Sequence, residues 1–168
     1  ESHEPDSTFK LMELITDIKE KKADTSTVYD SKGGRIQYYG RSVKDSNGKG
    51  YGKISLARGF ELSSNTILVQ SVYDSYKNNP KQFVDRINSY GLNKPLGLPI
   101  KGEGKPVIPQ PGTNRWSGVA LPWMAFGYGL SVTPLQTLTL YNAVANDGVM
   151  VKPIFVSEIK EWNKTIKK

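Results

Sequence analysis

The segment Pro5-Asp6-Ser7-Thr8-Phe9-Lys10 opens a helical pattern that continues to about Lys22. Because successive helical residues are rotated by about 100°, this pattern has one mainly apolar stripe and one polar side. The stripe contains, in angular order, Lys10, Leu14, Ser7, Ile18, Leu11 and Ile15. The polar side contains Thr8, Glu13, Thr16, Lys19 and Glu20. A serine and a lysine therefore lie at the N-terminal end of the face that we expect to be buried.

The spacing Ser7-x-x-Lys10 places a hydroxyl and an amine one helical turn apart. A serine hydroxyl becomes a good nucleophile only when a base accepts its proton, and a partly desolvated lysine can be that base. The helix N-terminus favours negative charge developing on the serine oxygen. The spacing alone is also that of an N-terminal serine beside a lysine whose apolar stem packs on the helix.

A second polar group, Ser63-x-Asn65, follows a predicted helix over residues 55–62. The Ser63 hydroxyl could relay a proton, and the Asn65 amide offers a donor and an acceptor to a peptide-like substrate. Serine and asparagine also favour helix caps and turns, so a purely structural interpretation remains open here.

The remaining pattern predicts further helices and short strands. Residues 27–29 and 35–39 flank a turn-rich segment at 30–34, which predicts a hairpin, and residues 45–50 read as a loop. A helical run carries Ile67, Val69, Val72, Tyr73 and Tyr76, and Pro80 opens a short helix that Gly91 closes.

The C-terminal half begins with a stretch rich in glycine and proline, from about 93 to 131, which is too long for an ordinary connector and is expected to be packed or functional. Thr133-Pro134-Leu135-Gln136 is a capping box with proline at the first helical position. That helix should run to about Asn146, followed by extended segments between Val149 and Ile159.

Composition excludes several functional classes. The 168 residues suit one domain or part of a larger one, and the absence of cysteine excludes disulfide scaffolds and cysteine-rich zinc sites. No cluster of metal ligands stands out, and we expect no metal and no cofactor. The net charge of +7 raises the possibility of an anionic polymer, but the basic residues are scattered, so nucleic acid is not expected as a partner. Neither a membrane segment nor a signal peptide is expected in the sequence.

Three ordered segments resemble the class B penicillin-binding proteins, the transpeptidases of cell elongation and division. They are the stretch around Ser7 from Glu4 to Lys10, the stretch from Ile54 to Thr66 with Ser63 and Asn65, and the stretch from Phe126 to Gln136 continued by Ala145-Asn146-Asp147-Gly148. The first two match two of the three motifs that serine β-lactamases and penicillin-binding proteins share. The resemblance covers nearly the whole chain.

The resemblance implies a mixed α/β, β-lactamase/transpeptidase-like fold, of which this chain holds mostly the helical subdomain with a few short strands. It implies acyl transfer on peptidoglycan stem peptides, with Ser7 as nucleophile, Lys10 as general base, Ser63 as a further catalytic group and Asn65 as a substrate-binding residue. β-Lactam antibiotics would acylate Ser7. Membrane-anchored division or elongation proteins would be partners of the parent protein, at the periplasmic, extracytoplasmic face of the cytoplasmic membrane.

Two departures from the family pattern stand out. The family usually has glycine immediately before the active serine, where this chain has Asp6, a residue that could cap the helix or repel an anionic substrate. The third motif, Lys-Thr/Ser-Gly, is missing, because Lys164-Thr165-Ile166 lacks the glycine. We therefore expect residues 1–168 to be a partial transpeptidase domain that ends before that strand and is inactive alone. A β-lactam sensor, a β-lactamase-like serine hydrolase, a non-catalytic division scaffold and a basic polymer-binding module are the alternatives.

Overall fold

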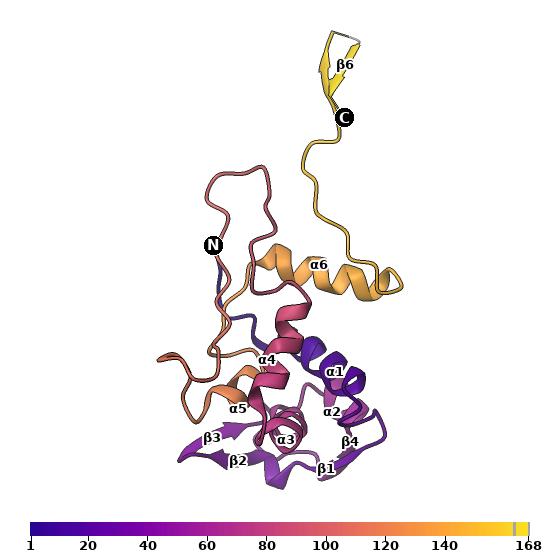
Figure 1. Cartoon of the computed structure of the whole chain (residues 1–168). Coiled ribbons are helices and arrows are strands. Elements are labelled where there is room, and N and C mark those ends of the chain that lie inside the picture. The colour runs from indigo at the N-terminus through magenta and orange to yellow at the C-terminus, as the bar shows by residue number, and fades with distance from the viewer. Residues whose placement is uncertain (163, 168) are drawn as a thin grey trace.

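A computed structural model describes residues 1–162 and 164–167 of the chain (Figure 1). The helices are the 3₁₀ segments η1 (Asp6–Phe9) and η2 (Lys32–Gly34), and α1 (Lys10–Lys19), α2 (Leu56–Glu61), α3 (Asn65–Tyr76), α4 (Pro80–Ser89), α5 (Ala120–Met124) and α6 (Pro134–Ala145). The strands are β1 (Val28–Asp30), β2 (Arg35–Tyr38), β3 (Arg41–Lys44), β4 (Lys53–Ser55), β5 (Ile159–Glu161) and β6 (Lys164–Lys167). The mixed α/β, mostly helical composition predicted from the sequence is confirmed.

The strands form separate antiparallel pairs, and the predicted hairpin over residues 27–39 is wrong. β1 pairs with β4, with Tyr29 opposite Ile54, while β2 pairs with β3, with Ile36 opposite Val43. The hairpin turn lies at Tyr39-Gly40, where both residues have positive φ, as a tight two-residue connection requires. The turn-rich segment 30–34 instead contains η2 and leads the chain from one pair to the other.

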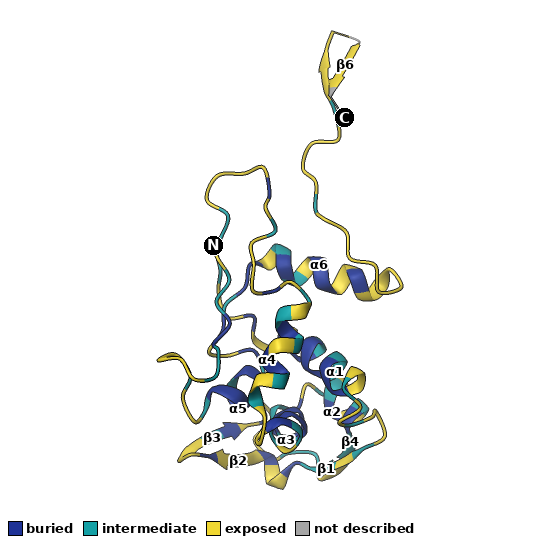
Figure 2. Ribbon diagram, viewed as in Figure 1, coloured by how far each residue is buried: buried dark blue, intermediate teal, exposed yellow. Residues whose placement is uncertain are grey.

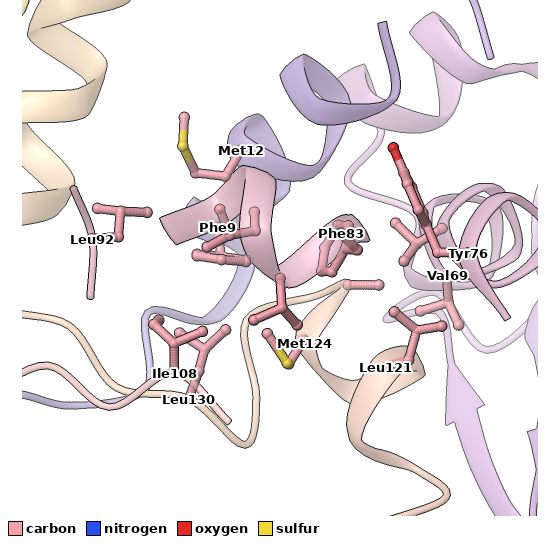
Figure 3. Close-up of a cluster of buried hydrophobic side chains, with 14 of the residues drawn as sticks. Phe9, Met12, Val69, Tyr76, Phe83, Leu92, Ile108, Leu121, Met124 and Leu130 are labelled. Carbon is pink, nitrogen blue, oxygen red and sulfur yellow. The ribbon is translucent and has the colours of Figure 1, made fainter. Parts of the chain in front are cut away.

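α3 is the central helix of the core, and more than half of its residues are buried (Figure 2). Its residues Val69 and Tyr76 belong to one apolar cluster with Phe9 of η1 and Phe83 of α4. Figure 3 shows Phe9 and Met12 of the N-terminal helix among side chains from distant segments, including Ile108 and Leu130. The start of the predicted nucleophile helix is therefore fixed by packing that the rest of the chain supplies.

The buried face of α1 differs from the predicted stripe. Lys10 is buried as predicted, but Glu13 and Thr16, assigned to the polar side, are also buried, and Ile18 is exposed. The reason is tertiary: the face toward α3 meets polar groups such as the Ser71 hydroxyl, so polar side chains occupy it.

Several local predictions are confirmed. The Thr133 hydroxyl accepts from the Gln136 N–H, and the Gln136 side chain accepts from the Thr133 N–H, forming the capping box of α6. The glycine- and proline-rich stretch is packed, since it contributes Leu98, Ile108 and four of the five residues of α5 to buried positions.

Beyond α6 the chain runs through an extended segment to the hairpin β5–β6, which Figure 1 shows apart from the helices. Apolar side chains on this segment are exposed, among them Ile154 at 76% and Trp162 at 94%. Within the described residues, no helix has both the length and the apolar character needed to cross a bilayer.

Candidate active site

Ser7 lies in η1, one turn before Lys10, with its side chain on the exposed surface. The Lys10 N–H donates to the Ser7 carbonyl, so the 3₁₀ turn that carries Ser7 leads directly into α1. The preceding residue, Asp6, has φ 51°, in the left-handed region that favours glycine. An L-residue there costs about 1–2 kcal/mol, and such strained residues cluster at functional sites.

The residues that precede Ser7 are held by backbone hydrogen bonds to the segment that contains Gly127 and Val132, which lies more than 120 positions further along the chain. His3 pairs with Val132 through two backbone hydrogen bonds of 3.0 Å, and the Asp6 N–H donates to the Gly127 carbonyl at 3.3 Å. The Glu4 carboxylate accepts from the Gly129 N–H at 2.8 Å. The first and third resemblance segments are thus one structural unit.

α6 also contacts this unit, because the hydroxyl of its residue Tyr141 donates to the Thr8 carbonyl at 3.0 Å. Asp6 does not cap η1 or α1 with its side chain, so the capping suggestion made from the sequence is wrong. A hydrogen bond to the Asp6 carboxylate instead helps to raise the pKa of Tyr128.

Ser63 and Asn65 lie where α2 ends and α3 begins. Ser63 has φ 52°, a second strained non-glycine position, and Ser64 caps α3 by accepting from the Ile67 N–H at 3.2 Å. The Asn65 amide donates to the Lys44 carbonyl at 2.8 Å, which ties α3 to the end of β3. The structural interpretation of this group as a helix cap is therefore correct for Ser64.

Asp45 fixes this junction and was not identified from the sequence. Its buried carboxylate accepts from the Ser64 hydroxyl at 3.0 Å, the Thr66 N–H at 2.9 Å and the Thr66 hydroxyl at 2.8 Å. The sequence pattern placed Asp45 in a loop, and Asp45 is indeed the first residue after β3. Only its three-dimensional contacts distinguish it from the exposed loop residues that follow.

Lys10 connects the two motifs directly. Its ammonium nitrogen donates to the Ser63 hydroxyl at 2.9 Å and to the Ser63 carbonyl at 2.7 Å, across 53 positions of sequence. The lysine is 1% exposed, although it lies one turn from the surface residue Ser7. The structure therefore brings Ser7, Lys10 and Ser63 to one place, with Asn65 two residues further along.

Burial lowers the pKa of Lys10 to about 8, although the carboxylates of Glu13, Asp45 and Asp6 act in the opposite direction. A lysine with a pKa near 8 has about a tenth of its population as free amine at pH 7, whereas an ordinary lysine has less than about 0.1%. This shift gives Lys10 the free amine that a general base requires near neutral pH.

Comparison with known proteins agrees with this geometry. Residues 1–168 match the sequence model of the penicillin binding protein transpeptidase domain. The penicillin-binding protein PbpB of Mycobacterium tuberculosis is 33% identical over 120 residues, which cover 71% of this chain and 17% of the relative. The peptidoglycan D,D-transpeptidase FtsI of Escherichia coli is 29% identical over 156 residues, 93% of this chain and 25% of the relative. The chain thus spans a quarter or less of the length of these two relatives.

Solved structures show the same fold. Penicillin binding protein 3 of Mycobacterium tuberculosis superimposes with a TM-score of 0.81 at 26% identity, over 99% of this chain and 36% of that one. The transpeptidase domain of Burkholderia pseudomallei penicillin-binding protein 3 has a TM-score of 0.79 at 20% identity, over 90% of this chain and 44% of that one. Together with the match over the whole chain, these likenesses confirm the resemblance to class B penicillin-binding proteins, and the chain belongs to the penicillin binding protein transpeptidase domain family.

Proposed function

We propose that the protein carrying this chain is a peptidoglycan D,D-transpeptidase that cross-links the bacterial cell wall through a serine acyl-enzyme. The observation that carries the proposal is the hydrogen bond of 2.9 Å from the buried Lys10 to the Ser63 hydroxyl, one helical turn from an exposed Ser7. This arrangement of two separate motifs supports Ser7 as nucleophile, Lys10 as base and Ser63 as proton relay.

In the proposed reaction, the Ser7 oxygen attacks the carbonyl carbon of the penultimate D-alanine of a stem peptide while Lys10 takes the hydroxyl proton. That proton then passes through the Ser63 hydroxyl to the nitrogen of the departing D-alanine. An amine of a neighbouring stem peptide then attacks the acyl carbonyl carbon and forms the cross-link as the bond from that carbon to the Ser7 oxygen breaks. The proton that the amine loses returns through Lys10 to the Ser7 oxygen. Asn65 holds the substrate amide, and the Ser7 backbone N–H is one donor to the oxyanion.

The proposal extends to partners and location. The relative from Escherichia coli is named a peptidoglycan D,D-transpeptidase, and one solved structure is of the Mycobacterium tuberculosis penicillin binding protein 3 complexed with aztreonam. By analogy, stem peptides would be the substrates of this protein, and β-lactams would acylate Ser7. Its place would be the periplasmic face of the cytoplasmic membrane, beside membrane-anchored division or elongation proteins.

Residues 1–168 would form part of the transpeptidase domain, ending before the Lys-Thr/Ser-Gly strand. The short span relative to the curated relatives supports this proposal, as does the exposure of apolar side chains along residues 149–159. Lys164-Thr165-Ile166 lies on β6, which Figure 1 shows well apart from α1, so this tripeptide does not line the Ser7 site.

Incubation of the full-length protein with a labelled penicillin, followed by intact-mass analysis, tests the function. A stable adduct that disappears in Ser7→Ala is the expected result. Rapid hydrolysis of the penicillin would favour a β-lactamase, and no adduct at all would favour a non-catalytic scaffold. Residues 1–168 alone should acylate about 10²–10³-fold more slowly, because one oxyanion donor is absent. Equal rates for the two proteins would contradict the proposed domain boundary.

A further inference from the structure

The buried face of α1 carries a row of charged groups behind the nucleophile. Lys10, Glu13 and Asp17 follow one another at helical spacings of three and four residues, and they are 1%, 0% and 0% exposed. Ser7 lies one further turn toward the N-terminus. The row therefore continues from the proposed nucleophile into the protein interior.

Glu13 is the member of this row that the reaction scheme leaves unexplained. Neither of its carboxyl oxygens has a hydrogen-bond partner among the residues that the structure describes. Asp17 differs, because one of its oxygens accepts from the Ser71 hydroxyl of α3. A fully buried carboxylate without hydrogen bonds is costly, so burial raises the pKa of Glu13 well above its usual range, and a nearby cation such as Lys10 lowers the cost of the charged form.

The charged and titratable groups around Glu13 come from α1, β1, α3 and the end of β3. Lys10 and Asp17 act on it from its own helix. Burial raises the pKa of Tyr29 of β1, and Glu13 acts in the same direction. Tyr76 of α3 lies beside Asp17. Asp45, beyond β3, acts on Lys10. Lys10 is thus the cation that counteracts the effect of burial on the pKa of Glu13. In turn, Glu13 is the carboxylate that most strongly counteracts the effect of burial on the pKa of Lys10.

We propose that Glu13 is a positioning residue of the acylation reaction, whose buried carboxylate opposes the desolvation of Lys10 and so sets the pH range in which Lys10 accepts the Ser7 proton. The inference rests on the proposed transpeptidase function. A base must lose its proton readily at the working pH, yet it must also hold the proton that it takes from the nucleophile. Burial alone serves the first requirement, and the carboxylate behind Lys10 serves the second.

The two groups titrate as a pair. Burial raises the pKa of Glu13 and lowers that of Lys10, so their proton equilibria approach each other, and the pH profile reports the pair. Removal of the Glu13 carboxylate takes away the largest charge effect that opposes the desolvation of Lys10 and leaves only those of Asp45 and Asp6. Its proton is then lost at lower pH, and the acid limb of the acylation profile should move in the same direction.

The experiment measures the second-order rate of penicillin acylation across pH for the full-length protein and its Glu13→Gln variant. The acid limb of the E13Q profile should lie at lower pH than that of wild type. At pH values on the wild-type acid limb the variant should therefore react faster, by about tenfold for each pH unit by which its limb is displaced. Above the limb E13Q should react more slowly than wild type, because a Lys10 of lower pKa holds the transferred proton less well. Glu13→Asp, which keeps the charge, should retain the wild-type limb.

Glu20→Gln is the matched control, since it removes a carboxylate at the C-terminal end of α1 that acts on neither Lys10 nor Glu13, and its limb should stay at the wild-type position. Glu13→Met, an unbranched apolar replacement, provides a second charge-free variant if E13Q folds poorly, and its limb should also move to lower pH. An unmoved limb in both charge-free variants would overturn the inference. So would a loss of rate that is uniform across pH, because that is the signature of a purely structural role. A wild-type protein that forms no adduct would instead refute the proposed function itself.

Discussion

Replacing Gly127 by alanine should displace the backbone that carries Ser7, because Gly127 packs directly on Asp6, the residue before Ser7. A Cβ atom at this position would lie 2.0 Å from the Asp6 carbonyl oxygen and 2.7 Å from its carbonyl carbon. Both are backbone atoms, so no flexible side chain can move aside. The residue also has φ +87°, a conformation that alanine rarely adopts.

The two costs can be separated with a neighbouring glycine. Gly129 has φ +72°, but a Cβ there would meet nothing within 4 Å. Gly129→Ala should therefore lower the free energy of unfolding by only the conformational cost, about 1–2 kcal/mol. Gly127→Ala adds an overlap cost of about 1–3 kcal/mol, which gives a total of about 2–5 kcal/mol.

Urea unfolding of both variants measures this difference, and penicillin acylation measures its effect on the site. A displacement of the Ser7 backbone of about 1 Å should lower the acylation rate about 100-fold in Gly127→Ala. Gly129→Ala, whose N–H still donates to Glu4, should acylate at close to the wild-type rate. If the two variants lost stability and activity equally, the contact with Asp6 would not be what fixes Ser7.

Four further outcomes are expected. Lys10→Ala should lower acylation of Ser7 by about 10²–10⁴-fold, the usual contribution of a general base, and near-normal acylation would remove it from that role. Asp6→Gly should raise the acylation rate with anionic penicillins, and the gain should be smaller at high salt. The glycine should also relieve the backbone strain at φ 51°. An unchanged or slower rate would show that the Asp6 charge does not face the substrate. Asp45→Ala should lower the free energy of unfolding by about 2–4 kcal/mol in urea titrations, because three hydrogen bonds to a buried carboxylate are lost, and a change below about 1 kcal/mol would contradict that assignment. Burial raises the pKa of Asp17 to about 6, so its contribution to stability is present at low pH and is lost as pH rises from about 4 to about 6; Asp17→Asn should remove about 2–3 kcal/mol of that pH dependence, and parallel stability curves would argue against it.

Interactions between near neighbours were accessible from the sequence. The capping box at Thr133 and Gln136, the helix that Pro80 opens and the position of Ser7 one turn before Lys10 were all predicted correctly. Each depends on backbone and side-chain groups within about one turn, so the local pattern contains the physical cause.

Strand pairing and the buried face of α1 depended on partners that the local pattern does not contain. Residues 28–30 pair with residues 53–55 because the chain, after forming β2 and β3, returns to lie beside β1. The angular pattern assigned Glu13 to the polar side of the helix, although its spacing from Lys10 and Asp17 also places these three residues on one face. That spacing was the signal that would have identified it.

The sequence by itself determined the order of the motifs, the helical turn that carries Ser7 and Lys10, the position of Ser63 and Asn65 after a helix, and the family to which the chain belongs. The tertiary structure alone decided that Lys10 is desolvated and that its amine meets Ser63 across 53 positions of sequence. It also decided that Asp45 holds the second motif in place. The physical reason is that basicity depends on burial and on nearby charge, and both are properties of side chains that become neighbours only when the chain has folded.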